Sequence, residues 1–201
     1  MVQPKKKLGQ HFLTSDVIAQ RIAESVDIND VPILEIGPGK GKLTRFLIER
    51  FGSLLKAIEV DDESVEYLAA NFPELEGNVI AADFLKTDFS IHFANRFDVV
   101  GNFPYNISSQ ILFKVLEHRN QIQQVVGMFQ KEVADRVVSG PGSKTYGILS
   151  VLVQAYYNVE YLFTVQPGSF FPPPKVKSGV IRLNRNDEEK LDCDELLFFT
   201  T

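Results

Sequence analysis

The chain has 201 residues, is 44% hydrophobic, carries a formal net charge of −5 and contains one cysteine, Cys193. This length and apolar content are enough for one main domain with a buried core. A single thiol excludes an internal disulfide framework and a cysteine-based zinc cluster. No stretch approaches the roughly 18 apolar residues of a membrane span, and the start lacks the pattern of a signal peptide, so we expect a cytoplasmic protein that does not enter a membrane.

The negative charge is concentrated near the end of the chain. Residues 187–195 hold six acidic side chains and one lysine, a local charge of −5, so the rest of the chain is neutral. Basic clusters occur at Lys5, Lys6 and Lys7, at Lys40 and Lys42, and at Lys175 and Lys177. Each cluster is either an ordinary solvated surface or a contact for phosphate groups. A nucleic-acid partner is therefore not excluded by the net charge.

Helical and strand-like patterns alternate from Thr14 to about Arg185. The first elements expected are a helix capped by Thr14, Ser15 or Asp16, a strand at 33–36, a helix at 42–51, a strand at 54–60 and a helix ending near 72. Strands at 78–82 and 97–101, a helix at 108–117, a strand at 124–129, a helix ending by 139, a helix near 148–155 and strands near 159–164 and 179–183 follow. This alternation predicts an α/β fold with about seven mostly parallel strands and helices on both faces.

The character of the sequence changes after Arg185, where acidic residues lead into the apolar cluster 196–199. We expect one domain over residues 1–185. Residues 186–201 are interpreted as a linker and the start of a truncated second domain, and the alternative is that the cluster folds back onto the main domain.

A glycine-rich segment, Glu35 to Gly41, follows the first expected buried strand and precedes a helix. Its glycines permit a tight turn and close approach of the backbone to a ligand. A dinucleotide fingerprint needs a glycine where Lys42 stands, and no Gly-Lys-Ser/Thr triplet of a P-loop follows. The pattern E-x-G-x-G-x-G instead favours an S-adenosylmethionine loop.

Two carboxylates end the next two expected strands. Glu59 is placed to accept ribose hydroxyl groups, and Asp83 to accept a hydrogen bond from an adenine amine. Each alone is also an ordinary solvated strand end. The strand order expected for such a sheet puts the first and fourth strands side by side, which brings Gly37 against Asn102.

The tetrapeptide Asn102-Phe103-Pro104-Tyr105 follows the buried strand 97–101. It offers a side-chain carbonyl, a projecting backbone carbonyl before proline and a flat aromatic ring. These groups suit the exocyclic amine of a nucleobase, above all adenine, although the same residues also make an ordinary turn.

Five motifs follow one another along the chain, namely 7–13, 35–41, 102–105, 130–134 and 170–178. In order and spacing they resemble the KsgA/Dim-type small-subunit ribosomal RNA adenine N6,N6-dimethyltransferases, over about residues 4–185. The resemblance implies a seven-stranded, Rossmann-like class I methyltransferase fold. It also implies S-adenosylmethionine as cofactor, no metal, and two adjacent adenosines near the 3′ end of small-subunit rRNA as targets. A monomer acting on a pre-ribosomal particle is expected.

Site residues follow from the same resemblance. It implies a cofactor site of Gln10, His11, Leu13, Gly37, Gly39, Glu59, Val60, Asp83, Phe84 and Asn102. Catalysis is expected from Asn102, Phe103, Pro104, Tyr105 and Phe170, and RNA binding from Lys5, Lys6, Lys7, Lys175 and Lys177. Phe170 is read as a stacking face opposite Tyr105, with a core position as the alternative. His11 either orders the N-terminal arm or acts as a general base, and the first role is favoured.

The sequence departs from the family pattern in one position. It also leaves other functions open. The second residue of the tetrapeptide is usually leucine or isoleucine, whereas here it is Phe103. Family members also carry a small helical C-terminal domain. A nicotinamide oxidoreductase is disfavoured by Lys42. An Erm-type large-subunit rRNA methyltransferase and a non-catalytic assembly or transcription factor remain the alternatives.

Overall fold

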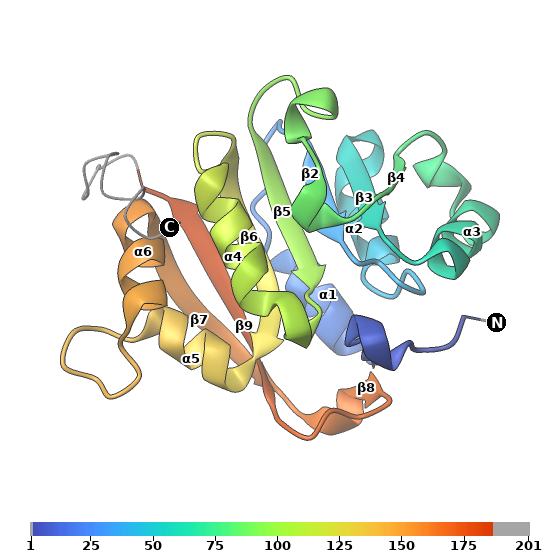
Figure 1. Cartoon of the computed structure of the whole chain (residues 1–201). Helices are drawn as coiled ribbons and strands as arrows, with labels where there is room; N and C mark the ends of the chain where they lie inside the picture. The colour runs from blue at the N-terminus through green and yellow to red at the C-terminus, as the bar shows by residue number, and fades with distance from the viewer. Residues whose placement is uncertain (1, 187–201) are drawn as a thin grey trace.

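The computed structural model describes residues 2–186, and within this range seven strands form one twisted sheet (Figure 1). Its strands are β2 (Ile33–Ile36), β3 (Leu55–Glu59), β4 (Val79–Ala81), β5 (Phe97–Asn102), β6 (Ile122–Gln130), β7 (Tyr157–Val165) and β9 (Ser178–Arg185). The expectations for 187–201, including Cys193 and the apolar cluster, lie outside the described residues.

The order across the sheet is β4-β3-β2-β5-β6-β9-β7. Neighbouring strands from β4 to β6 are parallel, and β9 runs antiparallel to both β6 and β7. The central strands β2 and β5 are almost entirely buried, as expected for strands covered by helices on both faces. The predicted α/β fold is confirmed, including the pairing of the first and fourth predicted strands.

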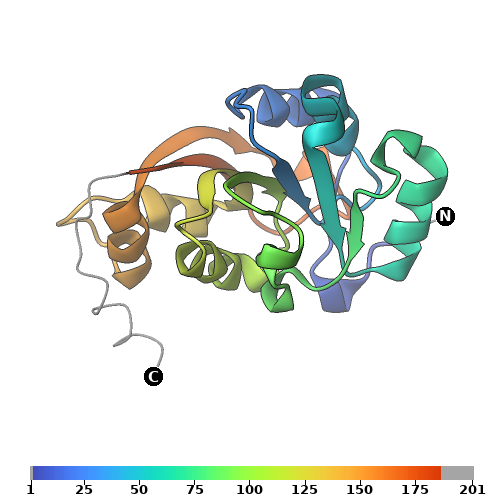
Figure 2. The same cartoon turned by 90° about the horizontal axis from the view of Figure 1, so that it is seen from above.

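Helices cover both faces of the sheet. The helices are α1 (Asp16–Glu24), α2 (Thr44–Phe51), α3 (Asp62–Asn71), α4 (Ser108–Glu117), α5 (Lys131–Val138) and α6 (Ile148–Tyr156). Figure 2 shows α1 and α2 on one side and α4, α5 and α6 on the other, and two apolar clusters fill the corresponding layers. Among the described helices, none is both long and apolar enough to cross a membrane.

The start of α1 shows how the sequence sets an element boundary. Ser15 is the N-cap, and its hydroxyl accepts a hydrogen bond from the backbone N–H of Ile18 at 3.4 Å. Ala19, Ile22 and Ala23 are then buried on one face of the helix, as the helical period requires. Of the three caps considered, Ser15 is therefore the one used.

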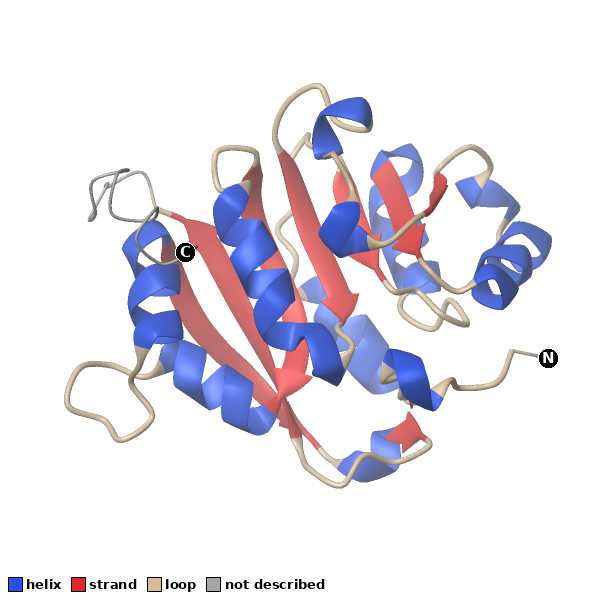
Figure 3. Ribbon diagram, viewed as in Figure 1, coloured by secondary structure: helices blue, strands red, loops and turns tan. Residues whose placement is uncertain are grey.

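A second, two-stranded sheet was not expected. In it β1 (Phe12–Leu13) pairs antiparallel with β8 (Phe170–Phe171), with Leu13 opposite Phe170 and Phe12 opposite Phe171. Two residues are too few to show the alternation that reveals a strand. This pairing fastens the N-terminal segment across the edge of the main sheet at which β2, β3 and β5 end (Figure 3).

The side chain of Phe103 points into the core. Its ring is 1% exposed and packs edge-on against Phe129, with ring centroids 4.9 Å apart. Two glycines make the space: a Cβ atom at Gly127 would lie 2.3 Å from the Phe103 ring, and one at Gly101 would lie 2.7 Å from it. The ring thus fills a volume left by two glycines on adjacent parallel strands.

Gly127→Ala should therefore lower the free energy of unfolding by about 1–3 kcal/mol, since the added methyl group displaces the Phe103 ring. Urea denaturation gives this value directly. Gly140→Ala is the matched control, because a Cβ atom there meets nothing within 4 Å. An unchanged midpoint for Gly127→Ala would contradict the packing described.

Candidate active site

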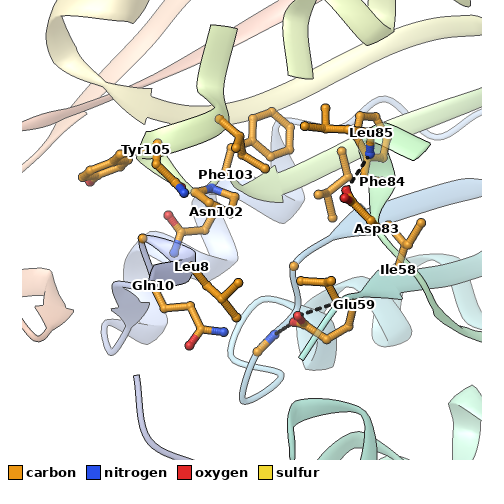
Figure 4. Close-up of a pocket in the computed structure, with 18 of the residues that line it drawn as sticks. Leu8, Gln10, Ile58, Glu59, Asp83, Phe84, Leu85, Asn102, Phe103 and Tyr105 are labelled. Atoms are coloured by element: carbon orange, nitrogen blue, oxygen red, sulfur yellow. Dashed lines mark hydrogen bonds between the residues drawn. The ribbon is translucent and has the colours of Figure 1, made fainter. Parts of the chain in front are cut away.

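A cavity of about 190 Å³ opens where β2, β3, β4 and β5 end, beneath the N-terminal segment. Figure 4 shows Glu59, Asp83 and Asn102 around it, with Leu8 and Gln10 of the N-terminal segment on one side. It brings together most of the predicted site residues, namely Gln10, His11, Gly37, Gly39, Glu59, Val60, Asp83, Phe84, Asn102, Phe103, Pro104 and Tyr105.

The glycine loop needs its glycines for conformation and for contact. Gly37, Gly39 and Gly41 all have positive φ angles, of 64°, 55° and 72°. A Cβ atom at Gly39 would lie 2.8 Å from the Phe12 ring, whereas one at Gly37 would meet nothing within 4 Å. Because Gly37 also lines the cavity, this open side is room that a ligand can use.

Glu59 is held by the backbone. Its Oε2 accepts a hydrogen bond from the Gly39 N–H at 3.1 Å, and its Oε1 accepts from Val60 and Asp61 at 2.9 and 3.0 Å. Burial raises the pKa of Glu59, and the three N–H donors oppose that rise. A carboxylate can accept about four hydrogen bonds, so Oε2 can still accept one from a ligand hydroxyl.

Asp83 ends the next strand and is more open. Its Oδ1 accepts a hydrogen bond from the backbone N–H of Leu85 at 3.0 Å, which fixes the side chain at the cavity wall. The nearest cation to Oδ2 is the Lys86 ammonium at 3.9 Å, on a side chain that is 84% exposed. Asp83 thus keeps an acceptor oxygen for a donor in the cavity.

The side chain of Asn102 has a defined orientation. Its Nδ2 donates a hydrogen bond to the backbone carbonyl of His11 at 2.9 Å. Since that carbonyl can only accept, the amide nitrogen must face it, and Oδ1 is the atom left for a ligand. The N-terminal segment therefore sets which end of the Asn102 amide serves the cavity.

His11 is anchored on three sides. Its Nδ1 lies 2.7 Å from the Pro172 carbonyl oxygen, so this nitrogen carries the proton and donates. Its ring stacks on Tyr105 with centroids 5.3 Å apart, and its carbonyl holds Asn102. These contacts tie the N-terminal arm to the cavity, and both roles considered for His11 stay predictions.

Tyr105 is fixed at both ends. One side of its ring is taken by His11, and its hydroxyl is hydrogen bonded to that of Ser178, a fully buried residue at the start of β9. Burial raises the pKa of Tyr105, so the phenol stays neutral. A planar ligand can stack only on the part of the ring that His11 leaves free.

Two predicted site residues lie in the core instead of the cavity. Leu13 is 6% exposed and Phe170 is 4% exposed, and both belong to the apolar cluster between α1, α2 and the sheet. They are cross-strand partners in the small sheet, where alternation sends one pair inward and the other, Phe12 and Phe171, outward. Phe171, at 56% exposed, carries the accessible ring that was expected of Phe170.

The predicted basic residues divide into two groups. Lys5 forms ion pairs with Asp61 and with Glu63, the second at 3.0 Å, so its charge holds the N-terminal segment to the start of α3. Lys6, Lys7, Lys175 and Lys177 lie outside the cavity lining, and the last two are exposed in the segment that follows β8. Lys5 therefore has a structural partner that the sequence pattern did not indicate.

Several lining residues were not singled out from the sequence. They are mostly apolar and include Leu8, Ile36, Ile58, Ala82, Leu85 and Asn106. Each lies within two residues of a predicted site residue, and this proximity is the signal that could have found it.

Comparisons with known proteins identify the family and the fold. A sequence family described as "Ribosomal RNA adenine dimethylase" matches residues 1–201. The "Ribosomal RNA small subunit methyltransferase A" of Parabacteroides distasonis is 60% identical over 201 residues, which is all of this chain and 75% of that protein. Two solved structures resemble the fold. A dimethyladenosine transferase from Plasmodium falciparum has a TM-score of 0.80 at 30% identity, covering 92% of this chain and 67% of its own. The 23S rRNA methyltransferase ErmE has a TM-score of 0.78 at 31% identity, covering 94% and 75%.

Glu35, at the start of the glycine loop, predicts a pH dependence of stability. It is 2% exposed, and burial raises the pKa of Glu35 to about 8 from its ordinary value of 4.5. Below pH 4.5 the group is protonated in both folded and unfolded chains. Between 4.5 and about 8 only the unfolded chain releases the proton, so stability should fall by up to about 1.4 kcal/mol per pH unit.

Glu35→Gln, which cannot ionise, should remove this component. Urea denaturation of both proteins at pH 5, 6, 7 and 8 measures it as the difference between their unfolding free energies. As the pH rises, the unfolding free energy of the wild type should fall relative to that of Glu35→Gln. Parallel curves over this range would show that Glu35 is ionised in the folded protein.

Proposed function

Because this chain belongs to the ribosomal RNA adenine dimethylase family, we propose that it dimethylates the N6 amines of two adjacent adenosines near the 3′ end of small-subunit rRNA. The observation that carries the proposal is the orientation of the Asn102 amide. Its nitrogen donates a hydrogen bond to the His11 backbone carbonyl, so its oxygen is left for a ligand amine. Residues 1–185 would form the catalytic domain.

The cavity residues fit S-adenosylmethionine. Gly37 leaves open space beside the loop, Glu59 can accept a hydrogen bond from a ribose hydroxyl, and Asp83 can accept one from an adenine amine. When bound, this cofactor would supply an electrophilic methyl group on a positively charged sulfur. The chain's own residues must then hold and orient the acceptor amine.

The adenine amine is a poor nucleophile, because its lone pair is delocalised into the ring. The Asn102 Oδ1 and the Phe103 carbonyl oxygen would accept hydrogen bonds from its two N–H groups, which favours a pyramidal nitrogen with a localised lone pair. Held in this way, the amine nitrogen would accept the methyl group that the cofactor would supply, and the proton it then loses would pass to water. After one transfer a single N–H remains, so the second transfer proceeds with one of these bonds lost.

The Phe103 ring does not narrow the base pocket, because it is packed into the core and only its carbonyl is needed. Tyr105 provides the stacking surface for an adenine that has left its helix. Extrusion costs a few kcal/mol, and stacking returns roughly 1–3 kcal/mol. Positioning of the adenine amine next to the methyl group would supply most of the rate enhancement.

Identity favours small-subunit rRNA over the large subunit as the substrate. The small-subunit relative is 60% identical, whereas ErmE is 31% identical. The retained Asn102, Tyr105, Glu59 and Asp83 also favour an enzyme over a pure assembly factor, which has no need of a full cofactor site. We place the substrate within a pre-ribosomal particle, contacted by Lys6, Lys7, Lys175 and Lys177.

Labelled S-adenosylmethionine tests the whole proposal. The protein is incubated separately with unmethylated small subunits, large subunits, naked rRNA and DNA, and the methylated base is mapped. Dimethyladenosine in small-subunit rRNA is the expected result. Label in large-subunit rRNA alone, in DNA alone, or in no nucleic acid would contradict it.

Asn102→Ala should reduce methyl transfer by at least about 100-fold, because the acceptor for the amine N–H is gone. Cofactor affinity, measured by calorimetry, should stay within several-fold. Asn95→Ala, at an exposed position, should leave both unchanged. Near-normal turnover of Asn102→Ala would remove this residue from the mechanism.

Glu59→Gln should instead weaken cofactor binding about ten-fold or more, since an amide nitrogen cannot accept from the backbone donors that hold the carboxylate. Calorimetry with S-adenosylmethionine measures the dissociation constant, and thermal melting checks the fold. The exposed Glu66 of α3 provides the control Glu66→Gln. An unchanged dissociation constant for Glu59→Gln would rule out the ribose contact.

A further inference from the structure

A second cleft, of about 520 Å³, lies on the outer side of the glycine loop. Residues of four separate segments line it: the small sheet, the loop, α2 and α3. The side chains used below are Phe12, Lys40, Lys42, Arg45, Tyr67 and Phe171. Neither the cofactor site nor the tetrapeptide explains this combination of cations and aromatic rings.

Charge in the cleft is of one sign. Lys40, Lys42 and Arg45 line it, and among residues 2–186, which the structure describes, no carboxylate does. Asp16 lies just outside and pairs with Lys42 at 2.6 Å and with Arg45 at 2.5 Å. One carboxylate cannot neutralise three cations, and lysine and arginine keep further N–H donors for a second anion.

Aromatic rings stand beside these cations. Phe171 is 56% exposed, although it follows the buried Phe170. The Lys40 ammonium lies 5.3 Å from the centre of the Phe12 ring, and Tyr67 of α3 also lines the cleft. Cations that can contact phosphates, next to rings on which bases can stack, characterise sites for single-stranded nucleic acid.

The cleft lies close to Asn102. A small cavity of about 30 Å³ shares Phe12, Lys40 and Lys42 with the cleft and is also lined by Asn102 and Gly37. Phe12, Lys40 and Lys42 thus lie between the cleft and the cavity at Asn102, which makes a nucleotide next to the target adenosine the occupant that we consider for the cleft.

We propose that this cleft binds a nucleotide that flanks the target adenosine, with its phosphate on Lys40, Lys42 and Arg45 and its base on Phe171. The inference rests on the proposed function and adds to it the part of the RNA that the catalytic domain itself contacts. It assigns a role to Lys40 and Lys42, which the cofactor site does not use.

Equilibrium binding tests the cleft independently of methyl transfer. The probes are unmethylated small ribosomal subunits and a single-stranded RNA of 12 nucleotides containing two adjacent adenosines, each measured at several salt concentrations. Lys40→Gln combined with Lys42→Gln should weaken binding of both probes roughly five-fold or more at 0.1 M salt. It should also reduce the slope of log K against log salt by about one to two.

Two further variants separate this effect from a folding defect. Asp16→Asn removes the competing carboxylate and should tighten RNA binding at low salt, which a damaged fold could not do. Phe171→Ala should weaken binding about five-fold or more with little change in salt slope, because it removes stacking and no charge. Lys144→Gln, in the exposed loop between α5 and α6, is the control and should match the wild type.

The outcomes distinguish the cleft from the function. The dissociation constant for S-adenosylmethionine should stay within two-fold of the wild-type value in all four variants, namely the double lysine variant, Asp16→Asn, Phe171→Ala and Lys144→Gln. If the double lysine variant binds RNA with the wild-type affinity and salt slope, the proposal that the cleft binds RNA is wrong, even where methyl transfer is found. The proposal is also wrong if the wild-type protein self-associates and Phe171→Ala abolishes that self-association while RNA binding is unchanged. The cleft would then be the contact site for a second copy of the chain. RNA binding that depends on the cleft, without methyl transfer, would instead contradict only the proposed function.

Discussion

The parallel pairing of β2 with β5 is the constraint on which the site depends. In this register Leu34 lies opposite Val99 and Glu35 opposite Val100, and both strands are buried on both faces. Parallel strands end at the same edge of a sheet, so Gly37, which follows β2, lies beside Asn102 at the end of β5. A shift of one residue would reverse the side chains of a strand and turn the Asn102 amide away from the cavity that it lines.

The N-terminal segment holds the side chains of Asn102 and Tyr105 in place at the end of β5. The His11 carbonyl orients the Asn102 amide, and its imidazole fixes both Tyr105 and the Pro172 carbonyl. One histidine thus joins three segments that are far apart in the sequence. Through these contacts the N-terminal segment keeps the Asn102 side-chain oxygen free on the cavity side.

The sequence was informative where its signals were local. Strands and helices of the main sheet were predicted to within a few residues, because apolar runs and caps such as Ser15 determine them. The roles that depend on pairing between distant segments could not be predicted. Phe170 faces the core because Leu13 is its cross-strand partner, and Lys5 is engaged because Asp61 lies at the start of α3. Neither partnership leaves a pattern along the chain.

The packing of Phe103 has an evolutionary consequence. Its ring occupies space that exists only because positions 101 and 127 lack side chains. A relative with leucine at 103 leaves part of that space empty, and a side chain at 127 can fill it without disturbing the neighbouring carbonyl. We therefore expect a side chain at 127 only in relatives whose residue at 103 is smaller than phenylalanine, whereas position 101 should stay glycine, because a Cβ atom there would also lie 2.7 Å from the Ile36 carbonyl oxygen.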